Sequence, residues 1–197
     1  MRYHPAPMMQ ATRARLFELL RTLSFAEREV VLSSGLRSNF YVGCKQTTLT
    51  AEGHVLVGRA LLGEIDVYER SQGRTVAAVG GLTLGADPIA SAISLTSGLG
   101  ARPLPAFIVR KEPKGHGTGT WIEGLDRIPK GSEVVILEDV VTTGASGLRA
   151  VKRARDAGYE VRLMLALVDR LEGGREAIEA EDCQLNALFT RDDFLER

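Results

Sequence analysis

The spacing of hydrophobic positions changes about a third of the way along the chain. In the first third, apolar residues at helical spacing predict one helix over 11–23 and a second from a cap at Thr50 to about residue 65. Between these helices, apolar runs at 30–32 and 40–42 flank a Ser-Ser-Gly sequence, which predicts a β-hairpin with a loose turn. We therefore expect this part to combine helices with a hairpin.

The rest of the chain alternates between short apolar runs and helical stretches. The runs lack polar alternation, which is typical of parallel strands covered on both faces. They comprise residues 76–79, 106–109, 134–137 and 163–168. The other expected elements are helices at 86–99 and 146–158, and a helix and a final strand within 175–197. This order predicts an α/β fold with an open, mainly parallel sheet flanked by helices. We expect a single domain over 1–197, with an N-terminal segment to about residue 50 and a core over about 66–170.

The strongest chemical signal lies where the third apolar run ends. Two acids, Glu138 and Asp139, precede a loop of small residues that opens the next predicted helix. The loop consists of Val140, Val141, Thr142, Thr143, Gly144, Ala145 and Ser146. Backbone N–H groups at a helix N-terminus bind anions and a glycine permits close approach, so the loop predicts a phosphate cradle. The acids would repel that phosphate, and we expect them to hold the two hydroxyls of a ribose. The alternative is a capped strand–helix turn without a ligand.

This segment resembles the motif with which type I phosphoribosyltransferases bind phosphoribosyl pyrophosphate (PRPP). The shared pattern is four apolar residues, two acids and a loop rich in hydroxyls and glycine, which here spans Val134 to Ser146. The resemblance implies the fold of that family. It also implies that the acids hold the ribose hydroxyls and that the loop holds the 5′-phosphate.

A cluster of basic side chains follows the second apolar run. It consists of Arg110, Lys111, Lys114 and His116. The Gly and Pro residues around it predict a mobile loop. A solvated turn is the alternative, but a chain without net charge gathers cations here at the end of a strand. The string Arg-Lys-Glu-x-Lys-x-His-Gly resembles the catalytic loop of orotate phosphoribosyltransferases. Such cations could neutralise the charge that builds on a departing pyrophosphate, and His116 could supply a proton or a hydrogen bond.

Three further segments are similar to this family. The hairpin resembles a hood that covers the base, with Tyr41 as a candidate stacking residue, although a place in the hairpin core suits an aromatic equally well. The stretch 79–87 occupies the place of a loop that meets pyrophosphate, and Arg170 occupies that of an arginine that reaches the base. The chain departs from the family at Ser33, where many members carry lysine, and at Thr83-Leu84, where many carry Tyr-Lys.

Charge and composition exclude other classes of function. Lys plus Arg number 25 and Asp plus Glu number 25, so no overall field attracts nucleic acid or an anionic membrane. Cys44 and Cys183 have no metal-ligand spacing, and we expect two free thiols in a reducing cytosol. Residues 1–10 do not resemble a signal peptide, and no apolar run approaches the roughly twenty residues needed to cross a bilayer. We therefore expect a cytoplasmic protein.

The resemblance implies transfer of the phosphoribosyl group from PRPP to orotate, giving orotidine 5′-phosphate and pyrophosphate in the de novo synthesis of UMP. The implied catalytic residues are Lys111, His116 and Asp139, and the implied orotate contacts are Tyr41, Thr142 and Arg170. Mg²⁺ would be held mainly by PRPP, without a dedicated metal site in the protein. A homodimer with shared active sites is also implied.

Two alternatives to this function keep the same fold. The first is a phosphoribosyltransferase that acts on a purine. The second is a PRPP-sensing regulator, which would keep the cradle and lose catalysis. The neutral charge, the lack of a basic stripe or DNA-binding segment, and the intact basic loop favour an enzyme over the regulator.

Overall fold

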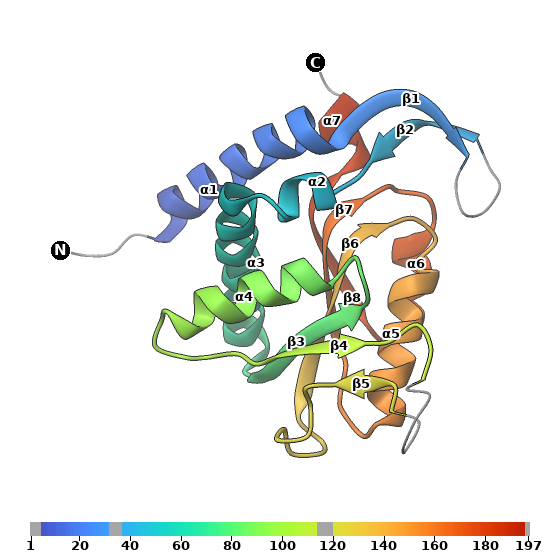
Figure 1. The fold of residues 1–197 in the computed structure, drawn as a ribbon. Coiled ribbons are helices and arrows are strands. Elements are labelled where there is room, and N and C mark those ends of the chain that lie inside the picture. The colour runs from blue at the N-terminus through green and yellow to red at the C-terminus, as the bar shows by residue number, and fades with distance from the viewer. Residues whose placement is uncertain (1–4, 32–36, 114–119, 196–197) are drawn as a thin grey trace.

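The computed structural model describes residues 5–31, 37–113 and 120–195 (Figure 1). The chain starts with α1 (Pro5–Leu19), which continues as the π-helical turn η1 (Leu20–Ser24). The predicted helix over 11–23 is therefore present, but it starts earlier and changes its hydrogen-bond pattern in its last turn. β1 (Phe25–Val31) and β2 (Arg37–Val42) then pair antiparallel, which confirms the predicted hairpin. The Ser-Ser-Gly turn lies outside the described residues.

Two helices follow the hairpin. The single turn α2 (Lys45–Thr48) was not predicted, and it leads into α3 (Ala51–Gln72). The predicted cap is confirmed, because Thr50 Oγ1 accepts a hydrogen bond from a backbone N–H of the first turn at 3.0 Å. The predicted end near residue 65 is wrong, since buried Tyr68 continues the apolar face of the helix and the core holds its last turns as well.

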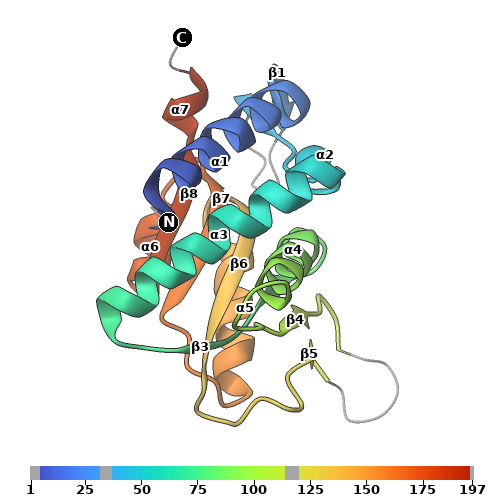
Figure 2. The same ribbon diagram turned by 90° about the vertical axis from the view of Figure 1, so that its left-hand side faces the viewer.

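A six-stranded sheet forms the centre of the molecule, in the order β5-β4-β3-β6-β7-β8 (Figure 2). Its strands are β3 (Val76–Leu82), β4 (Ala106–Val109), β5 (Ile122–Glu123), β6 (Glu133–Val141), β7 (Leu163–Asp169) and β8 (Gln184–Thr190). Neighbouring strands are parallel, except that β4 pairs antiparallel with the short, unpredicted β5. The four predicted apolar runs form β3, β4, β6 and β7. Every residue of β7 is buried, which explains its lack of polar alternation.

Helices cover both faces of the sheet (Figures 1 and 2). One layer consists of α1, α3 and α4 (Asp87–Gly98), and the other of α5 (Ala145–Asp156) and α6 (Gly174–Glu179). Strand β6 serves both layers, because Val135 and Leu137 belong to the core with α3 and α4 while Val134 and Ile136 belong to the core with α5. The predicted open, mainly parallel sheet flanked by helices is confirmed.

The C-terminal part ties the hairpin to the sheet. The helix and strand predicted within 175–197 are α6 and β8, and a short helix, α7 (Arg191–Leu195), follows them. The ring of Phe194 in α7 lies 5.0 to 5.8 Å from the rings of Phe17, Phe25 and Phe40. This cluster joins the hairpin to α1 and α7, beside the carboxyl ends of β6 and β7 (Figure 1).

Both cysteines are buried and unpaired, as expected. No helix in the described parts of the chain is both long and apolar enough to cross a bilayer. Within the same ranges, no group of three or more His, Cys, Asp or Glu side chains could hold a metal ion.

Candidate active site

The predicted site residues follow the ends of three adjacent strands. Thr142 follows β6, Arg170 follows β7, and the turn 83–86 follows β3. The three strands are parallel neighbours, so these residues come to the same edge of the sheet. The Arg170 N–H donates to the Val141 carbonyl oxygen at 2.9 Å, which joins the ends of β6 and β7 directly. This is the edge at which open α/β sheets bind ligands.

The loop after β6 ends at the N-terminus of α5. Gly144 is the N-cap, with φ +78°, and a Cβ atom there would lie 3.0 Å from the Gly174 carbonyl oxygen. Backbone conformation and space therefore both favour glycine at this position. Among the described residues, no side chain caps α5 and its first turn carries no acid. The N–H groups of that turn and the helix dipole can thus act on an anion, which suits the predicted phosphate cradle.

The other residues of the predicted cradle surround this turn. Val141 is buried at the end of β6, whereas Thr143 and Ala145 are exposed at the surface of the loop. The Ser146 hydroxyl accepts a hydrogen bond from Arg149 Nη2 at 3.4 Å. The cradle is therefore anchored at Val141, at the end of β6, and is open to solvent at Thr143.

Asp139 faces the turn after β3 and the short helix α2. Its Oδ2 lies 3.2 Å from Lys45 Nζ, and its Oδ1 accepts the Val140 N–H at 3.1 Å. A Cβ atom at Gly85 would lie 2.5 Å from Oδ1, so the turn after β3 lies directly against this carboxylate. The charge of Asp139 raises the pKa of Lys45. Lys45 was not predicted as a site residue, because its neighbours in the sequence give no sign of a contact with Asp139, 94 residues away.

Glu138 lies in a different environment from its neighbour. Its side chain is buried toward α5, where Oε2 lies 3.8 Å from the position of a Cβ atom at Gly147 and has no hydrogen-bond partner. Burial raises the pKa of Glu138 to about 8, and the adjacent charge of Asp139 contributes to the shift. The sequence suggests two equivalent carboxylates, whereas the structure shows one that faces the turn and one that is buried, with a raised pKa.

The basic loop follows β4, as predicted. Of its described residues, Arg110 and Lys111 on the outgoing side and Trp121 on the returning side lie close together, and we call them the neck of the loop. The Arg110 N–H donates to the Trp121 carbonyl oxygen at 2.9 Å, and the Arg110 guanidinium pairs with Glu123 at 3.3 Å. Lys111 is exposed at the surface. Lys114 and His116, the other two members of the predicted cluster, lie outside the described residues.

Arg170 is buried at the end of β7, with 4% of its surface exposed. Its Nη2 lies 2.8 Å from Glu172 Oε1, and its guanidinium lies over the Phe40 ring at 5.4 Å from the centroid. It does not form a surface pair with Asp169, whose fully buried carboxylate lies 3.2 Å from Arg175 instead. A buried guanidinium beneath the hairpin suits a site that recognises planar oxygen acceptors.

The two aromatic residues of β2 occupy opposite sides of the hairpin. Phe40 is buried and enters the aromatic cluster, whereas Tyr41 is 36% exposed. The Tyr41 hydroxyl would lie 2.9 Å from a Cβ atom at Gly43, which places the ring over the glycine two residues before Lys45. The place in the hairpin core thus belongs to Phe40 and not to Tyr41.

The turn after β3 carries no cation. Thr83 Oγ1 donates to Asp87 Oδ2 at 2.6 Å, and Leu84 is exposed. Gly81 permits close packing between β3 and β6, because a Cβ atom there would lie 2.2 Å from the Leu137 carbonyl oxygen. Lys45 of α2 brings a positive charge to this region through its ion pair with Asp139, whose carboxylate lies against the turn at Gly85.

The parallel sheet, the uncapped helix after two acids and the hairpin over the strand ends define a type I phosphoribosyltransferase fold. No protein-family model matches the chain. The chain is 50% identical over 183 residues to an orotate phosphoribosyltransferase of Sorangium cellulosum, covering 93% of each protein. It is 47% identical over 191 residues to that of Aquifex aeolicus, covering 95% of this chain and all of the relative.

A solved structure supports the same relationship. The orotate phosphoribosyltransferase of Mycobacterium tuberculosis in complex with PRPP is 38% identical, with a TM-score of 0.73, and the match covers 94% of this chain and 99% of that one. The chain belongs to the orotate phosphoribosyltransferase family.

Proposed function

We propose that this chain transfers the phosphoribosyl group of PRPP to orotate, giving orotidine 5′-phosphate and pyrophosphate in pyrimidine biosynthesis. The observation that carries the proposal is the meeting of an uncapped helix N-terminus, Asp139 and buried Arg170 at the ends of two adjacent strands. These three features match the three parts of the reacting complex: a phosphate, a ribose and a carboxylate-bearing base. Residues 1–197 act as one domain, with the hairpin as a hood over the core.

PRPP is held by the loop after β6. The N–H groups and hydroxyls from Thr142 to Ser146 bind the 5′-phosphate, and Val140 and Val141 position the loop. Asp139 accepts hydrogen bonds from ribose hydroxyls, in exchange for part of its contact with Lys45. Glu138, because it stays protonated near neutral pH, contributes a hydrogen bond without adding a second negative charge beside the phosphate.

The basic loop acts on the leaving group. Arg110, Lys111, Lys114 and His116 neutralise the charge that develops on pyrophosphate as the bond to the anomeric carbon breaks. Mg²⁺ fits this site, because Asp139 offers carboxylate oxygens beside the turn that meets pyrophosphate. The ion would screen the charges of PRPP, and PRPP itself would supply most of its ligands.

Arg170 selects the base. The carboxylate of orotate can accept two parallel hydrogen bonds from the guanidinium, a geometry that lysine does not reproduce. Thr142 lies at the adjacent strand end and bonds the pyrimidine ring, while Tyr41 stacks on it from the hairpin. We also propose a cytoplasmic homodimer with shared active sites, in which Lys111 enters the site of the partner subunit, and no nucleic-acid partner.

The base preference tests this function. Wild-type protein with PRPP and Mg²⁺ should use orotate and reject uracil, adenine and hypoxanthine, by factors that can reach about 10⁴. Arg170→Ala should lose orotate turnover selectively, with little change in the KM for PRPP. Arg191→Ala is the matched control, because that guanidinium lies over the same Phe40 ring at 5.9 Å from the centroid. Preferred turnover of a purine or of uracil by the wild-type protein would overturn the assignment.

A further inference from the structure

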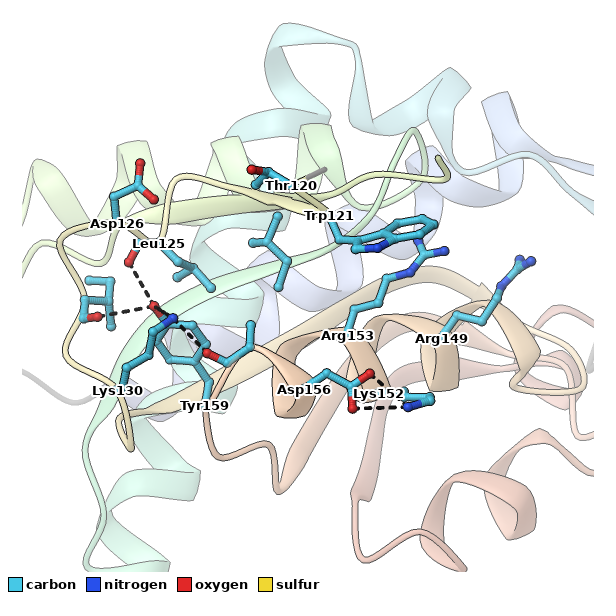
Figure 3. Close-up of a pocket in the computed structure, with 13 residues that line it drawn as sticks. Thr120, Trp121, Leu125, Asp126, Lys130, Arg149, Lys152, Arg153, Asp156 and Tyr159 are labelled. Atoms are coloured by element: carbon cyan, nitrogen blue, oxygen red, sulfur yellow. Dashed lines mark hydrogen bonds and ion pairs between the residues drawn. The ribbon is translucent and has the colours of Figure 1, made fainter. Parts of the chain in front are cut away.

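A single side chain of α5 binds both sides of the neck of the basic loop. On the outgoing side, the Arg153 guanidinium donates to the carbonyl oxygen of Arg110 through Nη1, and to that of Lys111 through Nη2 at 3.3 Å. On the returning side, the guanidinium lies against the Trp121 ring, 3.8 Å from its centroid (Figure 3). We name this arrangement of Arg153 and Trp121 the neck clamp.

The clamp reinforces a neck that is otherwise short. The backbone holds it through the Arg110–Trp121 hydrogen bond and through two antiparallel pairs, Val109 with Ile122 and Ile108 with Glu123. In the described chain, Arg153 forms no ion pair with a carboxylate, so its hydrogen bonds go to the neck. The two carbonyl groups that it holds belong to Arg110 and Lys111, which are proposed to meet pyrophosphate.

Core packing holds only part of the returning side, because Ile122 is buried in the core whereas Trp121 beside it is not. A cleft of about 730 Å³ opens beside it, between α5 and the segment that follows the loop (Figure 3). The Trp121 ring lines this cleft and is 39% exposed. The stack and the two carbonyl hydrogen bonds therefore hold the neck together with its backbone pairs and the Arg110–Glu123 ion pair.

The clamp also ties the neck to the helix whose N-terminus forms the cradle of the same subunit. Arg153 lies on the same helix as Ser146, roughly two helical turns farther along. A helix is a rigid spacer, so the distance from the phosphate cradle to the neck is set by α5 as long as Arg153 holds the neck to it.

We infer that Arg153 is a positioning residue for the transfer reaction. Together with Trp121, it holds the neck in the position from which Arg110 and Lys111 act on the leaving pyrophosphate. This inference rests on the proposed function. The loop acts mainly on charge that develops in the transition state, whereas the cradle binds the ground state. Loss of the clamp should therefore lower kcat more than it raises the KM for PRPP.

Steady-state kinetics of three variants test the inference. Arg153→Ala should lower kcat by about 10- to 100-fold, the range that a misplacement near 1 Å can produce, and leave the KM for PRPP within about threefold. Arg153→Lys should restore only part of the rate, because it keeps the charge but lacks the planar fork and the stacking surface. Lys152→Ala is the control and should retain parental kinetics, since within the described ranges that exposed neighbour pairs only with Asp156, at 2.8 Å.

Fluorescence gives a second measurement that does not depend on catalysis. Trp121 is the only tryptophan of the chain, so its emission reports on the neck directly. Acrylamide should quench it more strongly in Arg153→Ala than in the parent or in Lys152→Ala, with or without PRPP. If Arg153→Ala does not fold, Arg153→Lys carries the same comparison.

A double variant tests whether Arg153 and Trp121 act together. Trp121→Ala should lower kcat like Arg153→Ala, and the double variant should be little slower than either single variant. Parental kcat and quenching in Arg153→Ala, or effects that multiply in the double variant, would overturn the clamp. A parent that quenches as expected but does not use orotate would instead overturn the proposed function and leave the clamp geometry standing.

Discussion

Glu138 and Asp139 are neighbours in the chain, yet they lie in opposite layers because successive side chains of a strand alternate. Asp139 faces Lys45 and the turn after β3, whereas Glu138 is buried toward α5 with one oxygen unpartnered. Burial, together with the adjacent charge of Asp139, raises the pKa of Glu138 and so favours its neutral form. A neutral Glu138 would limit the negative charge beside the proposed phosphate site.

The raised pKa of Glu138 predicts a dependence of stability on pH. The unfolded chain releases this proton near its ordinary pKa of 4.5, and the folded chain keeps it to about 8. The unfolded state therefore binds fewer protons in that window, so the free energy of unfolding falls as pH rises through it. Glu138→Gln removes this loss, and in urea titrations its stability relative to the parent should improve from pH 5 to pH 8, by at most about 1.4 kcal/mol per pH unit.

Asp139→Asn provides the matched comparison for this titration. Its carboxylate contributes to the shift of Glu138, so its removal should make the pH dependence shallower without abolishing it. Parallel curves for the parent and Glu138→Gln across the whole window would show that Glu138 is ionised in the folded protein.

At the scale of elements, helix α5 has two proposed roles, one at its N-terminus and one farther along. Its N-terminus, begun by Gly144, presents backbone N–H groups at the proposed phosphate site. Two turns later, Arg153 holds the neck of the basic loop. The turn at Gly144 is also crowded, because the start of α6 lies against it at Gly174.

Gly144→Ala should weaken PRPP binding at least about tenfold, because a Cβ atom at φ +78° strains the loop and lies 3.0 Å from the Gly174 carbonyl oxygen. Gly73→Ala is the matched control: φ is +63° there, but no atom lies within 4 Å of the new Cβ. Both variants should lose roughly 1–2 kcal/mol of stability from the left-handed conformation. In titration calorimetry, only Gly144→Ala should bind PRPP poorly, and parental affinity in that variant would contradict the cradle.

At the scale of the whole molecule, the proposed dimer makes a prediction about mixed chains. Lys111→Ala and Asp139→Asn should each be inactive alone. If Lys111 serves the site of the partner subunit, a hybrid dimer has one site without either change. An equal mixture should then recover about a quarter of the parental activity, since half of the dimers are hybrids and each has one intact site. A mixture that stays inactive although hybrids form would show that each site is built within one chain.

The elements of this fold could largely be predicted from local pattern. Fully buried strands need unbroken apolar runs, the cap of α3 uses the side chain of Thr50, and a phosphate cradle needs small residues after a strand. Each of these features can therefore be recognised from consecutive residues. The end of α3 was missed because Tyr68 holds its last turns by contact with the core, which local spacing shows only weakly.

The contacts that complete the candidate site were decided by tertiary structure. Lys45 meets Asp139 across 94 residues, and Arg153 binds carbonyl groups 42 and 43 residues before it. Neither position has a neighbour in the chain that marks its partner. The raised pKa of Glu138 likewise depends mainly on the burial of its side chain against α5. The sequence by itself determined which segments form strands, helices and a cradle, because those properties follow from residues a few positions apart; which side chains meet at the strand ends depended on how the sheet ordered those segments in space.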